Sequence, residues 1–295
     1  MFNQSVVSYP DRGPYGKSSY RGNCSGRIVR DFVETFMSNG DGLLIDPSEG
    51  GGTTRDVAQD LGVRYFGTDL SQGFNLLTDD LAETAGEQAS AVWWHPPYWD
   101  MIAYSGKQWG NRAHPHDLSQ MSLPDFVEAL ELAIMNIHDA TRPGGTYGIL
   151  MGNLRRQGRY YNLSSLVERV APGALVDEII KVQHNCRSDS RQYQGRLVRI
   201  AHEKLLVFRR DKATSLMFIE TATVRADNMV MTTWRCAVRR VLQCGTTFDL
   251  QAIYVRVEPY AKQRANRNWK AKVRQVLQNV DHFERVDTGV YRLAS

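Results

Sequence analysis

The sequence predicts an α/β protein with a mostly parallel sheet, followed by a small helical domain that carries a β-hairpin. Over the first 211 residues, short apolar runs alternate with helical patterns, which is typical of strands that pair in parallel. One of these runs leads into three consecutive glycines, and another into two consecutive prolines. Helical patterns dominate the rest of the chain. We therefore expect two domains, 1–211 and 212–295, with a boundary at about 210–230.

The elements of the first domain follow from hydrophobic periodicity and from residues that start and stop helices. Residues 1–22 are rich in Tyr, Gly and Ser and are expected to form a loop. Ser25 is suited to cap a helix, Pro124 to begin one, and Pro143-Gly144-Gly145 to end it. In chain order we expect a helix at 25–37, a strand at 43–45, a helix at 54–61, a strand at 64–69, a short element near 74–76, a strand at 91–94, a helix at 123–141, and strands at 146–151, 178–182 and 204–208.

The second domain has the pattern of a winged helix-turn-helix, because three helical segments precede one hairpin. The helices are expected at 233–242, 248–255 and 268–280, and the hairpin at 283–293 with its turn at Asp287-Thr288-Gly289. Its general shape resembles the module often attached to DNA-modifying enzymes. Residues 212–295 are therefore expected to bind DNA, although a module of this shape can also serve protein contacts.

The composition is that of an ordinary globular protein, with 42% hydrophobic and 23% charged residues. No apolar run approaches the roughly 20 residues that span a membrane, and no signal-peptide pattern opens the chain, so a cytoplasmic protein is expected. The four cysteines lie far apart without a C-x-x-C pair, which argues against a metal site. Residues 211–295 hold 14 Lys and Arg against 8 Asp and Glu, and this excess favours double-stranded DNA as a partner.

A strand, an acid and three glycines form the first chemical motif, from Asp46 to Thr54. Glycines let a ligand approach the backbone, and the helix after them offers unpaired N–H groups. The glycines do not follow G-x-G-x-x-G, and no Gly-Lys-Ser/Thr occurs in this motif, so dinucleotide and P-loop sites are not favoured here. Asp69 ends the next strand, where an acid commonly binds ribose hydroxyls. S-adenosylmethionine (SAM), with its ribose and ammonium group, fits Asp69 and Asp46; a glycine turn that only begins a helix is the alternative.

His95-Pro96-Pro97-Tyr98 is the second motif, and it follows the apolar run 91–94. It thus lies at the carboxyl end of an expected strand, the edge at which ligands bind in open α/β sheets. The prolines fix φ and remove two donors, while their carbonyl oxygens still accept hydrogen bonds. A rigid turn of acceptors beside an aromatic ring suits a flat heterocycle that carries an amino group. An ordinary loop after a strand is the alternative.

Together the two motifs resemble those of the amino-group DNA methyltransferases, which modify adenine N6 or cytosine N4. In that family a D-P-F-x-G-S-G-T-T segment binds SAM, and Asp46 to Thr54 matches it at most positions, with Ser48 replacing Phe and Gly51 replacing Ser. Pro96, Pro97 and Tyr98 match the family's (D/N/S)-P-P-(Y/F/W) turn, whereas His95 departs from it. The resemblance covers about residues 15–210 and implies a Rossmann-like class I SAM-dependent methyltransferase sheet.

The resemblance also implies the cofactor site. Tyr20-Arg21-Gly22-Asn23 looks like the segment that closes over the methionine end of SAM. The residues expected to bind the cofactor are Tyr20, Arg21, Gly22, Asn23, Asp46, Pro47, Gly50, Gly51, Gly52, Thr53, Thr54, Asp69 and Leu70.

The resemblance further implies a catalytic turn made of His95, Pro96, Pro97 and Tyr98. The His95 side chain and the Pro96 carbonyl would accept hydrogen bonds from the target amino group, and Tyr98 would stack on the flipped base. Because imidazole accepts only when neutral, the rate is expected to fall as the pH drops through about 6.5. His95 could instead only position the turn. Adenine N6 is the first expected target; cytosine N4 and a non-catalytic DNA-binding protein that kept the fold are the alternatives.

Cationic and aromatic segments are expected to contact DNA, although each could also be an ordinary solvated surface. Four segments carry these residues: the loop after the catalytic turn, the segment after the strand at 146–151, the segment 183–196 and the third helix of the second domain. The expected DNA-binding residues are Lys107, Trp109, Arg112, Arg155, Arg156, Arg159, Arg187, Arg191, Arg196, Lys262, Arg264, Arg267, Lys270, Lys272 and Arg274. A partner restriction nuclease and a homodimer are both compatible with this pattern.

Overall fold

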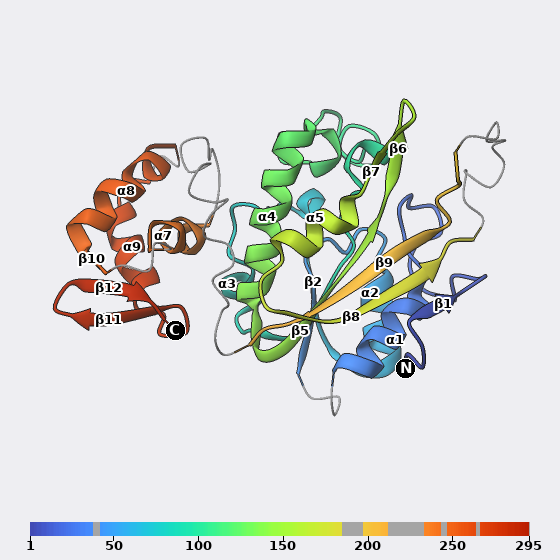
Figure 1. The fold of residues 1–295 in the computed structure, drawn as a ribbon, viewed down its shortest axis with the longest axis horizontal. Coiled ribbons are helices and arrows are strands. Elements are labelled where there is room, and N and C mark those ends of the chain that lie inside the picture. Colours follow the sequence, from blue (N-terminus) through green and yellow to red (C-terminus); the bar gives the residue numbers. More distant parts are fainter. Residues whose placement is uncertain (38–41, 185–196, 212–232, 243–246, 264–265, 295) are drawn as a thin grey trace. The chain divides into compact units, whose positions relative to one another are not determined.

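The computed structural model describes the chain except residues 38–41, 185–196, 212–232, 243–246, 264–265 and 295 (Figure 1). It divides into two compact units: Met1–Leu76 with Leu81–Asp211, and Leu77–Asp80 with Lys212–Ser295. The expected boundary at 210–230 falls largely on residues outside the described part of the chain.

The first unit is built on a seven-stranded sheet with the order β1-β8-β9-β5-β4-β2-β3. Neighbouring strands pair in parallel except β9, which is antiparallel to both β5 and β8. This mostly parallel α/β sheet confirms the predicted fold class. The strands are β1 (Val6–Ser8), β2 (Leu43–Asp46), β3 (Arg64–Gly67), β4 (Ala89–Trp94), β5 (Thr141–Gly152), β8 (Ala174–Val182) and β9 (His202–Arg209).

Helices cover both faces of the sheet, which is why its central strands are apolar at consecutive positions (Figure 1). On one face, Trp93 of β4 and Leu150 of β5 pack with Phe32 of α1. Their sequence neighbours Trp94 and Ile149 point to the opposite face and are also buried. The helices are α1 (Gly26–Phe36), α2 (Thr53–Leu61), α3 (Leu81–Ala85), α4 (Leu123–Ala140) and α5 (Leu163–Val170).

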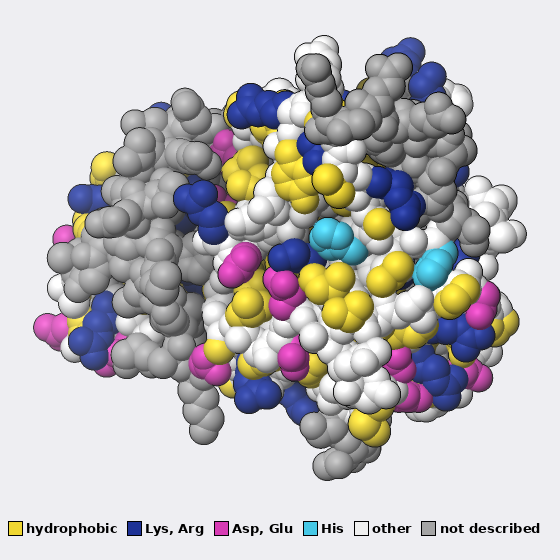
Figure 2. All heavy atoms as spheres, turned by 45° about the vertical axis from the view of Figure 1, so that its right-hand side comes forward, with side chains coloured by type: hydrophobic (Ala, Val, Ile, Leu, Met, Phe, Trp, Pro, Cys, Tyr) yellow, Lys and Arg dark blue, Asp and Glu magenta, His cyan; other side chains and the backbone are white. Residues whose placement is uncertain are grey.

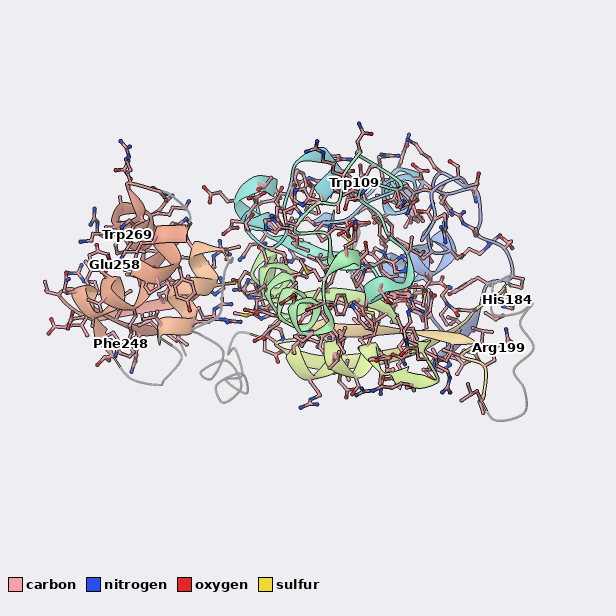
Figure 3. The ribbon with its side chains drawn as sticks, turned by 90° about the horizontal axis from the view of Figure 1, so that it is seen from above. Trp109, His184, Arg199, Phe248, Glu258 and Trp269 are labelled. Atoms are coloured by element: carbon pink, nitrogen blue, oxygen red, sulfur yellow. The ribbon has the colours of Figure 1, made fainter. Side chains whose placement is uncertain are left out.

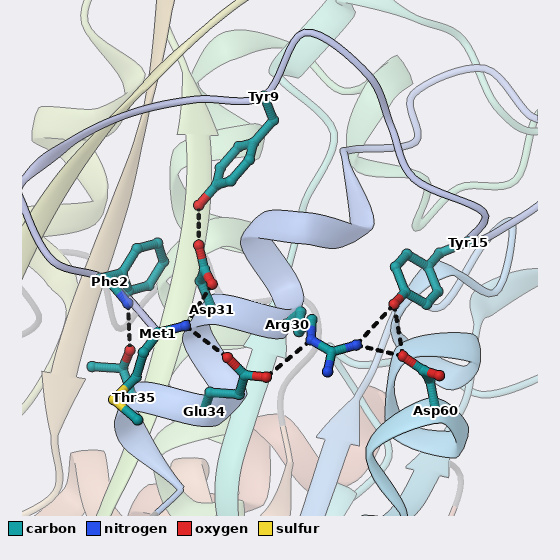
Figure 4. Close-up of polar contacts among 9 residues, drawn as sticks. All are labelled: Met1, Phe2, Tyr9, Tyr15, Arg30, Asp31, Glu34, Thr35 and Asp60. Carbon is teal, nitrogen blue, oxygen red and sulfur yellow. Dashed lines mark hydrogen bonds and ion pairs between the residues drawn. The ribbon is translucent and has the colours of Figure 1, made fainter.

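The amino-terminal segment is held against α1 and α2 by side-chain contacts (Figure 4). The Tyr15 hydroxyl donates a 2.8 Å hydrogen bond to Asp60 on α2, and Arg30 on α1 pairs with the same carboxylate at 2.5 Å. The Tyr9 hydroxyl donates to Asp31 of α1. These contacts direct the chain toward the carboxyl edge of the sheet, where residues 17–23 lie against the glycine turn.

Most predicted elements of this unit are present, and Ser25 caps α1 as expected, with its Oγ accepting from the Arg27 amide at 3.3 Å. Three expectations are wrong. Residues 1–22 contain β1, no strand forms near 74–76, and Pro143-Gly144-Gly145 lies inside β5 rather than after the helix. The long helix ends at Ala140 because the Thr141 backbone is already extended. The hairpin of β6 (Leu154–Arg156) and β7 (Arg159–Tyr161), which projects beyond β5, was not predicted (Figure 1).

The described residues of the second unit form three helices and a three-stranded antiparallel sheet with the order β10-β12-β11. Val238, Ile253 and Phe283 belong to its own apolar core. Phe248, Glu258 and Trp269, all in this unit, are labelled in Figure 3. The second helix begins two residues later and ends eight residues further along than expected, and the short strand β10 was not predicted. Its elements are α7 (Trp234–Leu242), β10 (Phe248–Asp249), α8 (Leu250–Gln263), α9 (Trp269–Leu277), β11 (Phe283–Asp287) and β12 (Val290–Leu293).

Candidate active site

The two motifs meet where the strand order of the sheet reverses. From β2 the chain first moves outward to β3 and then returns to β4 on the other side of β2. At such a switch point the loops diverge and leave a crevice outside the carboxyl ends of the strands, where α/β proteins bind ligands. Asp46 ends β2 and His95 follows β4. The Trp94 indole Nε1 donates a 3.1 Å hydrogen bond to Ser48 Oγ and so links the two turns directly.

The glycine turn is shaped for close backbone contact. Gly50 and Gly52 have φ values of 46° and 78°, in the left-handed region that favours glycine. A Cβ on Gly50 would lie 2.8 Å from the Tyr20 ring, and a Cβ on Gly51 would lie 2.5 Å from the Asn23 amide. The structure therefore places Tyr20 and Asn23, both predicted from the sequence, directly against this turn.

The segment around Arg21 and Gly22 bridges the glycine turn to the loop that follows the catalytic turn. The Arg21 amide donates to Gln108 Oε1 at 2.9 Å, and Gln108 Nε2 donates back to the Arg21 carbonyl at 3.2 Å. Gly22, with φ of 92°, lies so close to the Tyr104 hydroxyl that a Cβ would stand 2.1 Å from it. The closing segment and the loop therefore form one connected rim over the crevice.

Acidic side chains gather just beyond the carboxyl ends of β2 and β3. Asp46 is 4% exposed and accepts a 3.0 Å hydrogen bond from the Ser48 amide. Burial raises the pKa of Asp46 to about 7; hydrogen bonds from Thr54 and Ser48 oppose this, while the charges of Glu49 and Asp69 add to it. Such a carboxyl group is poised to gain its charge when a cation binds beside it.

β3 ends at Gly67 rather than at Asp69 as expected, so Asp69 lies just after the strand; its two oxygens accept from the amides of Ser71 at 2.8 Å and Gly50 at 3.1 Å. Each carboxylate oxygen has a second lone pair for a ligand hydroxyl. Leu70 begins the short 3₁₀ turn that Asp69 caps. Glu49, which the sequence reading missed, accepts from the Tyr65 hydroxyl at 3.1 Å and from Gln72 at 2.8 Å.

The helix after the glycine turn begins without a side-chain cap. Gly52 occupies the cap position of α2 and makes no such hydrogen bond. Thr53 and Thr54 are buried in the first turn, and Pro47 is buried beside Asp46. The Thr53 hydroxyl has no hydrogen-bond partner among the residues that the structure describes. The amino end of this nine-residue helix therefore leaves donor groups for a polar ligand.

A line of hydrogen bonds connects the catalytic turn to β9 and β8. His95 Nε2 lies 2.8 Å from the Tyr98 hydroxyl, which donates at 2.9 Å to Glu203 Oε1 on β9. Lys181 on β8 lies opposite Glu203 in the register and donates to Oε2 at 2.7 Å. The Tyr98 ring lies against Gly152 at the end of β5, where a Cβ would stand 2.5 Å from it. Glu203 and Lys181 were not predicted.

The environment of His95 corrects the expected pH response. Burial lowers the pKa of His95 to about 4; Lys181 also lowers it, while the charge of Glu203 opposes the shift. The imidazole is therefore neutral well below pH 6.5, and the value of an unperturbed histidine does not apply. No described residue donates a hydrogen bond to the carbonyl of Pro96, which is buried next to His95.

The loop between the catalytic turn and α4 is built around the buried carboxylate of Asp117. Asp117 accepts hydrogen bonds from Ser105 and Ser119, through both the amide and the hydroxyl of each, and these partners outweigh burial and lower the pKa of Asp117. Lys107 and Arg112 are exposed on this loop, whereas Trp109 is partly buried with its ring 6.1 Å from that of His114 (Figure 3).

The β6–β7 hairpin carries three predicted arginines. Arg155 lies 5.0 Å from the centroid of the Tyr160 ring, and Arg159 lies 5.3 Å from that of Tyr161. Arg156 pairs at 2.7 Å with Asp100, in the loop that follows the catalytic turn. Because that loop starts at the Pro-Pro turn, the ion pair holds the hairpin close to the catalytic turn. Arg187, Arg191 and Arg196 lie outside the described residues.

In the second unit the predicted cations have different surroundings. Lys270 lies 5.3 Å from the Tyr254 ring centroid, Arg274 donates to the Tyr254 hydroxyl at 2.8 Å, and Lys262 pairs with Glu258 at 3.2 Å. Arg267 is exposed, Lys272 is half-buried, and Arg264 lies outside the described residues.

On the face that Figure 2 presents, the described Lys and Arg side chains are spread among apolar and polar ones rather than gathered in one patch.

Two further findings concern metal ions and membranes. Within the described ranges, no group of three or more His, Cys, Asp or Glu side chains is arranged to hold a metal ion. None of the helices in those ranges is both long enough and apolar enough to cross a bilayer.

Comparison with known proteins finds weak structural similarities and no family. No protein-family model and no curated protein matches the sequence. Solved structures with a similar fold include TrmN from Thermus thermophilus (12% identity, TM-score 0.35, 64% of this chain and 50% of that one) and a methyltransferase from Pyrococcus furiosus (12%, 0.33, 68% and 88%). Human N-acetylserotonin methyltransferase, solved with SAM, is a third (11%, 0.33, 63% and 51%).

This chain spans about half the length of the Thermus and human proteins. Because all these similarities are weak, the strand order of the sheet, with its antiparallel β9, is the stronger indication of a Rossmann-like fold.

Proposed function

We propose that this chain is a SAM-dependent methyltransferase that acts on the exocyclic amino group of a flipped base in DNA, with adenine N6 as the target. The observation that carries the proposal is the meeting of the Asp46 glycine turn and the His95-Pro96-Pro97-Tyr98 turn at one switch point. An acidic, glycine-lined crevice lies on one side of it, and a turn with free acceptors lies on the other.

The crevice fits the cofactor on chemical grounds. Asp46, Glu49 and Asp69 raise the negative potential there, and a ligand with a net positive charge relieves it. A Cβ on Gly50 or Gly51 would collide with Tyr20 or Asn23, so the bare backbone of this turn is what lets the Tyr20–Asn23 segment pack directly against it, as the closing segment over the methionine end would have to. Asp69 would hold the ribose, Asp46 the cationic end, and the first turn of α2 the polar groups nearby.

The work of the chain is to position and polarise the target. The bound cofactor would supply the methyl group, with the electron pair of its C–S bond remaining on sulfur. An exocyclic amino nitrogen is a weak nucleophile because its lone pair is delocalised into the ring. The His95 side chain and the Pro96 carbonyl would accept its N–H bonds and so localise that lone pair. The Tyr98 ring, supported on Gly152, would stack on the base.

A DNA substrate is supported by the second unit and by the hairpin beside the crevice. The order of three helices and an antiparallel sheet, with β10 and β11 flanking β12, agrees with a winged helix-turn-helix. Its third helix, α9, carries cations together with Trp269. The hairpin presents Arg159 and the exposed Tyr160, a combination suited to phosphates and unstacked bases.

One experiment separates the candidate targets. Purified protein, double-stranded DNA and SAM with an isotopically labelled methyl group are incubated, and the DNA is digested to nucleosides for mass spectrometry. Labelled N6-methyldeoxyadenosine is the expected product, and labelled N4-methyldeoxycytidine would instead identify the cytosine enzyme. A protein that shifts DNA in a gel but transfers no label is a binding module. RNA in a parallel reaction tests the other nucleic acid, and Asp46→Asn serves as the inactive control.

A further inference from the structure

Glu203 and Lys181 lie on strands that neither motif occupies, yet they are joined to the catalytic turn. Lys181 donates to Glu203 Oε2 at 2.7 Å, and Gln183 donates to Oε1 at 2.8 Å. The Tyr98 hydroxyl reaches the same Oε1 at 2.9 Å and is 2.8 Å from His95 Nε2. Glu203 is 7% exposed. Burying the charges of Glu203 and Lys181 costs desolvation free energy, so we asked what the pair does for the catalytic turn.

The direction of each hydrogen bond in this line follows from the charge of Glu203. Burial alone would raise the pKa of Glu203, but Lys181, His95 and the hydrogen bonds outweigh burial and lower it, so Glu203 is a carboxylate. A carboxylate has no proton, so each of its partners must donate. Tyr98 has a single hydroxyl proton, which goes to Glu203. Its oxygen must therefore accept from His95, and the proton of the neutral imidazole lies on Nε2.

We propose that Glu203, paired with Lys181, is a positioning residue that acts through Tyr98 to hold His95 in its Nε2–H tautomer. This leaves the Nδ1 lone pair as the acceptor for the target amino group, an inference that rests on the methyl transfer proposed above. Among the described residues, no group is hydrogen-bonded to Nδ1, so that atom remains available. The opposite tautomer would present an N–H there and repel the amino group.

The transfer step balances with this assignment. The amino nitrogen uses its lone pair to form the bond to the methyl carbon, and the C–S bond breaks with its electron pair on sulfur. The nitrogen then sheds one proton to Nδ1. The resulting imidazolium is stabilised through Tyr98 by the charge of Glu203, as an acid stabilises a catalytic histidine in other enzymes, and it releases the proton to water.

The competing explanation is that Glu203 and Lys181 only hold β8 and β9 together. The same two strands supply a matched control, because Lys204 on β9 donates to Glu178 on β8 at 2.9 Å without reaching the catalytic turn. Tyr147 supplies a second control, since its buried hydroxyl donates to the Pro172 carbonyl and not to a histidine. If Glu203 and Lys181 only hold the strands together, replacing Glu178 should have the same effect as replacing Glu203, and replacing Tyr147 the same effect as replacing Tyr98.

The test reads the tautomer of His95 by ¹⁵N nuclear magnetic resonance of protein labelled at histidine, in the absence of cofactor and DNA. The wild-type protein should show one species, with Nε2 protonated and Nδ1 bare. Tyr98→Phe and Glu203→Gln should each show a mixture of both tautomers. Tyr147→Phe and Glu178→Gln should match the wild type. Tyr98→Phe keeps the ring on Gly152, so it decides the question even where Glu203→Gln does not fold.

A wild-type His95 protonated at Nδ1, or two variants that keep one unchanged tautomer, would overturn the proposal. Because this readout needs no methyl transfer, its failure is distinguishable from failure of the proposed function. In a methylation assay with saturating DNA and cofactor, Glu203→Gln should lower kcat by about 10- to 100-fold, whereas the KM for cofactor changes little. An equal loss in Glu178→Gln would assign the effect to strand pairing and would also overturn it.

Discussion

Trp94 and Ser48 are hydrogen-bonded across the switch point of the sheet, with the indole Nε1 donating to Oγ at 3.1 Å. Trp94 ends β4 immediately before the catalytic turn, and Ser48 lies in the turn that precedes the glycines. The bond therefore couples the positions of the two halves of the site. In the family that this chain resembles, a Phe stands at the position of Ser48. A phenyl ring has no oxygen to accept this hydrogen bond, so the contact depends on Ser48.

The first prediction concerns this link. Trp94→Phe removes the indole donor, and we expect weaker binding of SAM by about fivefold, since a lost hydrogen bond to a positioned turn is worth about 1 kcal/mol. Trp93→Phe is the matched control, because Trp93 is equally buried on the opposite face, against Phe32. Equilibrium dialysis with labelled cofactor measures both. Equal losses in the two variants would assign the effect to core packing instead.

The second prediction follows from the raised pKa of Asp46, which is about 7. A cationic ligand binds the charged carboxylate more tightly than the protonated one. The affinity for SAM should therefore rise with pH through about 7 and level off above it, by up to tenfold per pH unit on the rising part. Dialysis between pH 5.5 and 8.5 measures it, and the slope should vanish in Asp46→Asn. A flat wild-type profile would show that Asp46 does not face the cation.

The third prediction applies the same pKa to stability. A carboxyl whose pKa is raised on folding stabilises the protein fully only below its unfolded value, near 4, and this contribution is lost as the pH rises through about 7. Asp46→Asn removes the titration, so its advantage over wild type should grow from about pH 4 to 7, on the order of 2–4 kcal/mol, and then level off. Denaturant unfolding without cofactor measures the difference, and a pH-independent difference would contradict the burial argument.

The fourth prediction concerns the rate at saturating cofactor and DNA. His95 is surrounded by Tyr98, Glu203 and Lys181, and its pKa is lowered to about 4. It stays neutral above that value, so kcat should show no inflection near pH 6.5 and should fall only as the pH approaches about 4. Single-turnover rates from pH 5 to 8 test the upper range, and titration of the His95 ring by nuclear magnetic resonance gives the pKa itself. A midpoint near 6.5 would show that His95 is solvated.

The fifth prediction tests the second unit. Arg267 is exposed in the turn that precedes α9, and replacing it with Ala should weaken DNA binding and reduce the salt slope of the affinity by about 1. Arg64→Ala is the control, since Arg64 is an exposed arginine of β3 that pairs with Glu87 in the first unit. Fluorescence anisotropy over a range of salt concentrations measures both variants. The same slope in Arg267→Ala as in wild type would exclude Arg267 from the DNA contacts.

The sequence predicted the parts of this molecule that local chemistry determines. Ser25 caps α1, and the glycine and proline turns lie after β2 and β4, because capping, backbone freedom and strand ends are local properties. Residues that gain their role from pairing between strands were missed. Glu203 and Lys181 meet only because β8 and β9 adopt one particular register, which neither segment encodes alone.

The missed hairpin has a similar explanation. β6 and β7 are three residues each, too short for a periodic pattern, and Gln157 at their turn has φ of 49°, where a glycine or asparagine would have signalled the turn. The expected pH response failed for a different reason. A pKa depends on burial, and the sequence does not show that His95 is enclosed by residues from β8 and β9.

The central claim is that the crevice between Asp46, Asp69 and the Pro-Pro turn binds SAM. Isothermal titration calorimetry of the purified chain with SAM at pH 8 tests it most directly. We predict one binding site per chain, with an affinity that is much weaker in Asp46→Asn and unchanged in Glu178→Gln. No heat of binding in the wild-type protein, or unchanged binding in Asp46→Asn, would contradict it.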